Sequence, residues 1–408
     1  MGIAANQQRR FLDYLALLRP HLTRDSALPR RIKELLGRDR AIGARDRRLY
    51  RELIYTTLRY LPWIEPWLDP ALDTAARIAA WLAPEMRDTA NYRRELTVGW
   101  PSVPESLAAK ASDLTSLTGR TCDPQDLLPG WFREECPLAF EEPHLSSLLS
   151  RAPIWVRLQC QDRERVLREF LDCGWVLGIP SAPADAVCLP PDADVAKTDV
   201  YRRGFVEIQD LGSQFVLAHA SVVPGQHWLD ACAGAGGKTL QLARLVSPGG
   251  QVDAADIRLE ALAELTERAR RGRAENIRIM SEPLAGAEYD GVLVDAPCSG
   301  TGTWRRQPHL KWLTRSEHLN RFAAVQLQLL RANAPRVRPG GVLVYATCSL
   351  ARRENLFVAA EFAFSHPDFT PEPPSRDYGG AWDNYGTTLL PGTHNTDGFY
   401  VAVFRRRH

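Results

Sequence analysis

The chain has 408 residues, more than one hydrophobic core usually contains, so we expect two or three domains. Hydrophobic residues make up 45% of the chain and charged residues 25%, a balance that is typical of folded proteins and excludes an intrinsically disordered chain. No apolar run reaches the roughly 18 residues that a membrane-spanning helix needs, so we expect no membrane partner. The N-terminal residues lack the apolar core of a signal peptide, and we expect a cytoplasmic protein.

Basic residues are concentrated in two segments, although the net charge is only +2. Residues 1–60 hold 14 basic and six acidic residues, and residues 300–340 hold eight basic residues against Glu317 alone. This distribution indicates a one-sided basic surface that attracts a polyanion, and a solvated helix face would give the same pattern. Charge alone therefore leaves both interpretations open.

The eight cysteines include no C-x-x-C pair, so neither a zinc ribbon nor a thioredoxin-like site is expected and no metal site is predicted. In a reducing cytosol, individual thiols stay available for catalysis.

The pattern along the chain predicts three regions. Residues 1–145 show helical periodicity, with Phe11, Leu15 and Leu18 on one face, and predict a helical domain. Residues 151–204 change to strand-like runs around a short helix and predict a small α+β subdomain. Residues 205–408 alternate short apolar strands with helices, which is typical of an α/β doubly wound parallel sheet. There we expect strands over 227–232, 251–257, 277–281, 289–297, 341–349 and 396–407, and helices over 237–246, 258–272, 316–336 and 354–364.

A glycine-rich turn over residues 232–239 follows the first of these strands. Such a turn before a helix lets the backbone approach a ligand closely. A Walker motif would need glycine at Cys232, and a dinucleotide fingerprint would need glycine at Thr239. Asp256 ends the next strand, where a carboxylate accepts both hydroxyls of a ribose. The pattern favours a nucleoside cofactor such as S-adenosylmethionine, although a helix N-cap alone would also explain Asp256.

Two further strands run into cysteines. Asp295 and Cys298 follow one strand, and Cys348 follows another. One cysteine at a strand end is commonly a small buried hydrophobe, but two that face one crevice favour catalysis. Methylation of carbon 5 of cytosine needs such a set: a thiolate adds to carbon 6, a carboxyl group steadies the ring, and a second polar group assists release.

These motifs resemble those of the RsmB/Nop/Sun family of RNA 5-cytosine methyltransferases. The resemblance covers residues 150–408 through VEIQDLGSQ, DACAGAGGKT, PCSGTG and TCS. It implies a Rossmann-like class I methyltransferase domain over 205–408, preceded by a ferredoxin-like subdomain over 151–204. Residues 1–145 resemble a divergent NusB-like RNA-binding domain.

By position, the resemblance implies that Cys348 is the nucleophile, that Cys298 assists product release and that Asp295 contacts the cytosine. It also implies that Lys238 neutralises a carboxylate or an RNA phosphate. The family turn usually reads C-A-A-P-G-G-K, and Gly234-Ala235 replace Ala-Pro here without loss of the backbone donors. The implied S-adenosylmethionine contacts are Cys232, Ala233, Gly234, Ala235, Gly236, Gly237, Lys238, Asp256, Glu282 and Asp295, and the implied RNA contacts are Arg305, Arg306 and Lys311.

The expected substrate is 16S ribosomal RNA, with transfer RNA as the alternative, and we expect a monomer. A DNA cytosine methyltransferase would use Cys298 as its nucleophile, and the Thr-Cys-Ser strand end argues for RNA. A non-catalytic RNA-binding ribosome-assembly factor is the other class of function, and it would be favoured by loss of a catalytic residue. None of the implied catalytic residues is missing from the sequence.

Overall fold

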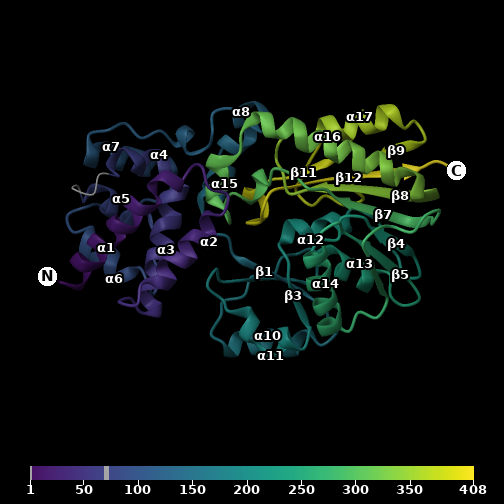
Figure 1. Cartoon of the computed structure of the whole chain (residues 1–408), viewed down its shortest axis with the longest axis horizontal. Helices are drawn as coiled ribbons and strands as arrows, with labels where there is room; N and C mark the ends of the chain where they lie inside the picture. Colours follow the sequence, from purple (N-terminus) through teal and green to yellow (C-terminus); the bar gives the residue numbers. More distant parts are fainter. Residues whose placement is uncertain (1, 69–72) are drawn as a thin grey trace. The chain divides into compact units, whose positions relative to one another are not determined.

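A computed structural model describes residues 2–68 and 73–408 of the chain (Figure 1). The chain divides into two compact units. The first, which we call the helical unit, contains Met1–Arg151 and Trp304–Arg315. The second, which we call the sheet unit, contains Ala152–Thr303 and Ser316–His408. Residues 304–315, which the sequence analysis assigns to the last domain, therefore belong to the helical unit.

The helical unit consists of helices whose apolar faces point inward, as the N-terminal periodicity predicts. In α1 (Ile3–Leu18), the side chains of Phe11, Leu15 and Leu18 are buried. Helix α3 (Ala44–Arg59) buries its apolar face in the same way. The predicted helical region is therefore confirmed. The other helices of this unit are α2 (Leu28–Arg38), α4 (Leu61–Ile64), α5 (Thr74–Leu82), α6 (Ala90–Leu96), α7 (Leu107–Thr118), α8 (Phe132–Glu135), α9 (His144–Leu149) and α15 (Pro308–Leu313).

The segment Trp304–Arg315 packs into the helical unit because it satisfies the carboxyl end of α3. The Lys311 ammonium donates a hydrogen bond to the carbonyl oxygen of Arg59 at 2.8 Å. The Trp312 indole donates one to the carbonyl oxygen of Leu58 at 2.7 Å. Both carbonyls lie in the last turn of a helix, where the helix itself offers them no N–H partner. The segment thus supplies donors that the helix end requires.

The sheet unit begins with a small antiparallel sheet of order β2-β1-β3. Its elements alternate β-α-β-α-β, so the α+β character predicted for residues 151–204 is observed. A complete ferredoxin-like motif reads β-α-β-β-α-β, which the described residues of this subdomain do not show. The elements are β1 (Ile154–Leu158), α10 (Arg163–Asp172), β2 (Ala186–Leu189), α11 (Asp199–Arg202) and β3 (Val206–Ile208).

The rest of the sheet unit is a doubly wound α/β domain, as predicted. Its strands lie in the order β10-β11-β12-β8-β7-β4-β5-β6, and β9 pairs with β12. Strands β4 to β8 pair in parallel, whereas β12 runs antiparallel to β8. The Rossmann-like fold and its closing strand are therefore confirmed. The strands are β4 (His227–Asp230), β5 (Gln251–Ala255), β6 (Ile277–Met280), β7 (Tyr289–Asp295), β8 (Val337–Thr347), β9 (Phe369–Glu372), β10 (Ala381–Trp382), β11 (Thr387–Leu389) and β12 (Phe399–Arg406).

Helices cover both faces of this larger sheet (Figure 1). Buried side chains of α12 and α13 form a core cluster on one face, and those of α16 and α17 form a second cluster on the other. Within the described residues, no helix combines the length and the hydropathy needed to cross a membrane. The helices are α12 (Leu211–Ala218), α13 (Gly237–Leu245), α14 (Leu259–Gly272), α16 (Ser316–Asn333), α17 (Leu356–Ser365) and α18 (Pro391–His394).

The parallel strands end at one edge of the sheet. The register pairs Asp295 at the end of β7 with Ala346 of β8, and Asp230 at the end of β4 with Leu293 of β7. Residues that directly follow β4, β5, β7 and β8 therefore meet at this edge, where ligands of doubly wound sheets bind. The predicted cysteines and the glycine-rich turn all lie there.

Candidate active site

Cys298 and Cys348 lie side by side after two neighbouring strands, β7 and β8. Their sulfur atoms are 3.3 Å apart and share a hydrogen bond. Both side chains are partly exposed, so a ligand can reach them. The hydrogen bond with Cys348, burial and the nearby charge of Glu354 raise the pKa of the Cys298 thiol well above its usual range. These effects favour the protonated form of Cys298.

Asp295 forms an ion pair with Lys238 at the same edge of the sheet. The ammonium nitrogen lies 2.8 Å from Oδ2 of Asp295 and 5.2 Å from the centre of the Phe399 ring. Lys238 is nearly buried, whereas the Asp295 side chain is 32% exposed. Lys238 therefore neutralises a carboxylate of the protein in this structure. The carboxylate keeps an exposed side that a ligand can approach.

The glycine-rich turn connects β4 to α13 and depends on glycine at position 236. Gly236 has φ +88°, and a Cβ placed there would lie 2.1 Å from Cδ1 of Leu265. Apart from its chain neighbours and the backbone of its own helix, no described heavy atom lies within 4 Å of a Cβ placed on Gly237, so the backbone is open there. An open backbone at the N-terminus of a helix fits a ligand that carries an anionic or polar group.

Asp256 follows β5 and joins the turn to the end of this strand. Its Oδ2 accepts a hydrogen bond from the backbone N–H of Gly234 at 2.8 Å. The Arg258 guanidinium donates to both carboxylate oxygens, at 3.0 and 2.9 Å. Burial alone would raise the pKa of Asp256, but these hydrogen bonds outweigh burial and hold the pKa below its ordinary value. An ionised acceptor therefore lies next to the turn, as a ribose contact requires.

The structure contains site residues that the sequence analysis missed. Glu354 is fully buried behind the two cysteines, and Asp230 is buried beneath the glycine-rich turn. The sequence feature that could have identified Asp230 is its position as a carboxylate at the end of an apolar strand. Glu354 lies six residues after Cys348, a spacing that matches no general motif.

Two of the three expected RNA contacts lie in the interior of the helical unit. Arg305 is 1% exposed and donates a hydrogen bond to the Ser150 hydroxyl at 2.9 Å. Lys311 is 2% exposed, and burial lowers its pKa well below the ordinary value. Neither side chain presents a charge to solvent, which argues against phosphate contacts at these positions. Arg306 is half-buried, and its RNA contact stays a prediction.

The other predicted contacts keep their status as predictions. Glu282 is exposed in the loop that follows β6. Cys232 lies in the glycine-rich turn, where burial raises the pKa of its thiol above the usual range. No cluster of three or more metal-ligating side chains occurs in the parts of the chain that the structure describes.

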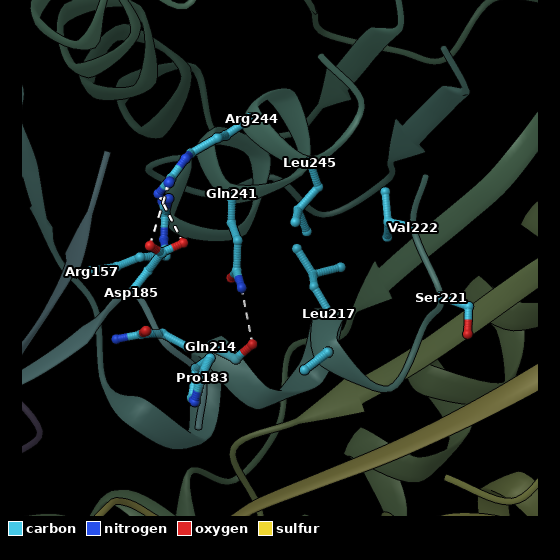
Figure 2. Close-up of a pocket in the computed structure, with 11 residues that line it drawn as sticks. Arg157, Pro183, Asp185, Gln214, Leu217, Ser221, Val222, Gln241, Arg244 and Leu245 are labelled. Carbon is cyan, nitrogen blue, oxygen red and sulfur yellow. Dashed lines mark hydrogen bonds and ion pairs between the residues drawn. The ribbon is translucent and has the colours of Figure 1, made fainter. Parts of the chain in front are cut away.

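A pocket of about 230 Å³ lies elsewhere in the sheet unit (Figure 2). Arg157 and Asp185 come from the small subdomain, and Gln241 and Arg244 come from α13. Arg244 pairs with Asp185 at 3.0 Å, and Arg157 donates a hydrogen bond to the neutral Gln209 side chain at 2.6 Å. Among the described residues, its lining includes none of the predicted site residues. The pocket therefore lies at a polar contact between the small subdomain and α13.

Known proteins resemble large parts of this chain. A family model described as 16S rRNA methyltransferase RsmB/F matches residues 218–405. The protein named ribosomal RNA small subunit methyltransferase B from Vibrio cholerae is 32% identical over 292 residues, which are 69% of this chain and 65% of that protein. The chain thus covers slightly less than two thirds of that relative. The protein of the same name from Escherichia coli O157:H7 is 32% identical over 299 residues, 69% of this chain and 67% of that protein.

Solved structures share the fold. The crystal structure of PH0851 has a TM-score of 0.73 and 21% identity, with 100% of both chains covered. A methyltransferase homolog protein from Pyrococcus horikoshii has a TM-score of 0.57 and 24% identity, with 64% of this chain and 89% of that chain covered. At these identities the likeness concerns the fold alone.

Proposed function

The chain belongs to the RsmB/F methyltransferase family, and we propose that it methylates carbon 5 of a cytosine in 16S ribosomal RNA. The observation that carries this proposal is the pair of thiols 3.3 Å apart at the ends of β7 and β8. The glycine-rich turn and the exposed side of Asp295 lie at the same edge of the sheet. A nucleophile, a second thiol and a carboxylate beside a cofactor turn are the groups that this reaction needs.

S-adenosylmethionine is the cofactor, and when bound it supplies an electrophilic methyl group. The turn over residues 232–238, together with Asp256, Glu282 and Asp295, would hold it. Two observations support the fit. The backbone at Gly237 is open at the N-terminus of α13. The carboxylate of Asp256 is an ionised acceptor beside the turn.

In the proposed mechanism the two cysteines have different roles. The Cys348 thiolate forms a bond to carbon 6 of cytosine, which makes carbon 5 nucleophilic. After carbon 5 has gained the methyl group, a base or water takes the proton of carbon 5, and the electron pair that remains restores the 5,6 double bond and expels the Cys348 thiolate from carbon 6. The sulfur of Cys298 lies 3.3 Å from that of Cys348, close enough to assist when the bond to carbon 6 breaks.

The Asp295 carboxylate would accept a hydrogen bond from the exocyclic amine of the cytosine, and one from ring nitrogen 3 once that nitrogen has gained a proton from water. Its ion pair with Lys238 fixes the carboxylate on one side and leaves the other side exposed. A fixed polar group costs little reorganisation when charge develops on the ring. The buried lysine therefore supports the orientation of the carboxylate that the reaction uses.

Cys298→Ala and Cys348→Ala test the mechanism directly. With a cytosine-containing 16S ribosomal RNA and S-adenosylmethionine, Cys298→Ala should accumulate a covalent protein–RNA adduct that survives denaturing electrophoresis. Cys348→Ala should form no adduct and no 5-methylcytosine, because no thiolate remains to attack carbon 6. Adduct formation by Cys348→Ala alone would assign the nucleophile to Cys298 instead.

The substrate is tested separately in cells that lack the protein. Bisulfite sequencing of total RNA should show that one cytosine of 16S ribosomal RNA loses its protection. Loss of protection in transfer RNA would replace the proposed substrate. Normal methylation in both RNAs, together with slow subunit assembly, would favour a non-catalytic assembly factor.

A further inference from the structure

A buried carboxylate joins the loops that carry the two cysteines. Glu354 is fully buried and lies directly before α17. Its Oε1 accepts a hydrogen bond from the backbone N–H of Ser299 at 2.9 Å, and its Oε2 accepts one from the Ser299 hydroxyl. Oε2 also accepts one from the Ser349 hydroxyl at 2.7 Å. Ser299 follows Cys298 and Ser349 follows Cys348, so one carboxylate holds the neighbours of both thiols.

A third element fixes this carboxylate in place. The Gln326 side-chain amide of α16 donates to Oε1 of Glu354 and to the Pro297 carbonyl oxygen, both at 3.0 Å. Pro297 directly precedes Cys298. The Cys298 loop is therefore bound to Glu354 both through Ser299 and through Gln326.

The loops that carry Cys298 and Cys348 also contact each other directly, through hydrogen bonds between uncharged groups. The backbone N–H of Gly302 donates to the Cys348 carbonyl oxygen at 3.0 Å. The hydroxyl groups of Thr301 and Ser349 lie 3.0 Å apart. These contacts align the backbones, whereas Glu354 adds hydrogen bonds to a charged acceptor, which are about twice as strong as neutral ones.

We propose that Glu354 is a positioning residue that holds Cys298 and Cys348 at the distance at which both thiols face one substrate base. This inference deepens the proposed function and rests on it for the role of the thiols. Glu354 does not touch the reacting atoms in this proposal. Its charge also helps to keep Cys298 protonated, after the effects of the Cys348 hydrogen bond and of burial.

The test measures the distance between the thiols in the full chain, without RNA or cofactor. Dibromobimane fluoresces strongly only after two nearby thiols have displaced both of its bromides. In the wild-type protein it should link Cys298 to Cys348, as identified by peptide mass spectrometry. In Glu354→Gln, an amide N–H group faces the donors whose hydrogen bonds the carboxylate accepts. The yield of the link between Cys298 and Cys348 should therefore fall about tenfold, which corresponds to the loss of a hydrogen bond to a charged group.

Glu361→Gln is the matched control, because Glu361 lies on α17 and is half-exposed in an ion pair with Arg331. This variant should keep the wild-type yield. A folded Glu354→Gln variant with the wild-type yield would overturn the proposal. If Glu354→Gln does not fold, Ser299→Ala replaces it, since this variant removes only one hydroxyl from the connection. A wild-type yield in Ser299→Ala would then overturn the proposal as well.

A methylation assay separates this inference from the proposed function. Glu354→Gln should lower kcat while the affinity for S-adenosylhomocysteine, measured by calorimetry, stays unchanged. An inactive wild-type protein with a normal thiol link would contradict the proposed function and leave the positioning of the thiols supported. An active wild-type protein in which the thiol link does not depend on Glu354 would support the proposed function and contradict the positioning role of Glu354.

Discussion

At the scale of single residues, Asp230 is a buried carboxyl group beneath the glycine-rich turn, and its ionised form destabilises the folded state. Its carboxylate is fully buried and accepts a hydrogen bond from the Thr239 hydroxyl at 2.7 Å. Its other oxygen, Oδ1, has no hydrogen-bond partner among the described residues. Burial raises the pKa of Asp230 to about 7. An ionised Asp230 therefore destabilises the folded state, because a buried charge has lost its hydration.

This shift predicts how stability depends on pH. Between the ordinary value of 3.8 and about 7, the folded state keeps a proton that the unfolded state releases. The free energy of unfolding should therefore fall as pH rises through this window, by at most about 1.4 kcal/mol per pH unit. Above about pH 7 the titration of Asp230 should cause no further change. Asp230→Asn cannot titrate, so its stability relative to the wild type should increase from pH 5 to pH 7.

Urea unfolding of both proteins at several pH values measures this difference. Asp172→Asn provides the control, because Asp172 is exposed at the end of α10. A difference between Asp230→Asn and the wild type that stays constant from pH 5 to pH 8 would contradict the predicted titration.

At the scale of elements, strand β3 is connected to the glycine-rich turn through a side chain of α14. Glu207 of β3 is 1% exposed and accepts hydrogen bonds from Arg268 of α14, at 3.2 and 2.9 Å. Arg268 also donates to the carbonyl oxygen of Ala235 at 2.7 Å. A strand of the small subdomain is thus connected through a helix to the turn. This connection gives a structural reason for the VEIQD motif at residues 206–210.

The connection predicts an effect on cofactor affinity. Glu207→Gln should weaken the hold on Arg268, loosen the Ala235 carbonyl and raise the Kd for S-adenosylhomocysteine about fivefold, which is about 1 kcal/mol. Calorimetry measures the affinity, and thermal unfolding checks that the variant folds. Glu267→Gln on the exposed face of α14 is the matched control, since Glu267 pairs with the exposed Arg270. Equal affinities in the two variants would show that the turn does not depend on Glu207.

At the scale of the whole molecule, the chain crosses between its two units more than once. It leaves the sheet unit after Thr303, enters the helical unit for Trp304–Arg315, and returns to the sheet unit at Ser316. Trp304 is buried, and its ring centre lies 4.6 Å from that of Phe132. The segment that follows the Cys298 loop is therefore part of the helical core.

Removal of the Trp304 side chain tests how firmly this segment is held. Trp304→Ala should lower the free energy of unfolding of the helical unit by about 3–5 kcal/mol, as expected for truncation of a buried aromatic side chain. Gln307→Ala, at an exposed position of the same segment, should change it by less than about 0.5 kcal/mol. Urea unfolding of the full chain, followed by circular dichroism, compares the two. A loss below about 1 kcal/mol for Trp304→Ala would mean that the segment is only loosely packed.

Local sequence patterns predict many elements of the sheet unit and the meeting of the two cysteines, but they do not predict the short strands β9, β10 and β11. Strands β4 and β7 and helix α14 lie within the ranges that periodicity predicts, because alternation and amphipathic spacing are local properties of the chain. Cys298 and Cys348 came together because parallel strands end at one edge of a sheet. The position of Asp256 beside the turn follows from the same rule.

Which charged groups are used inside the protein depends on tertiary packing. Lys238 pairs with Asp295, 57 residues away along the chain, and Lys311 pairs with a carbonyl 252 residues away. Glu354 gained its role from serines on two separate loops. A sequence reports the charge of each residue, but burial and hydrogen-bond partners depend on which distant segments pack together. For that reason Arg305 and Lys311, which form part of a basic run in the sequence, lie in the core of the helical unit.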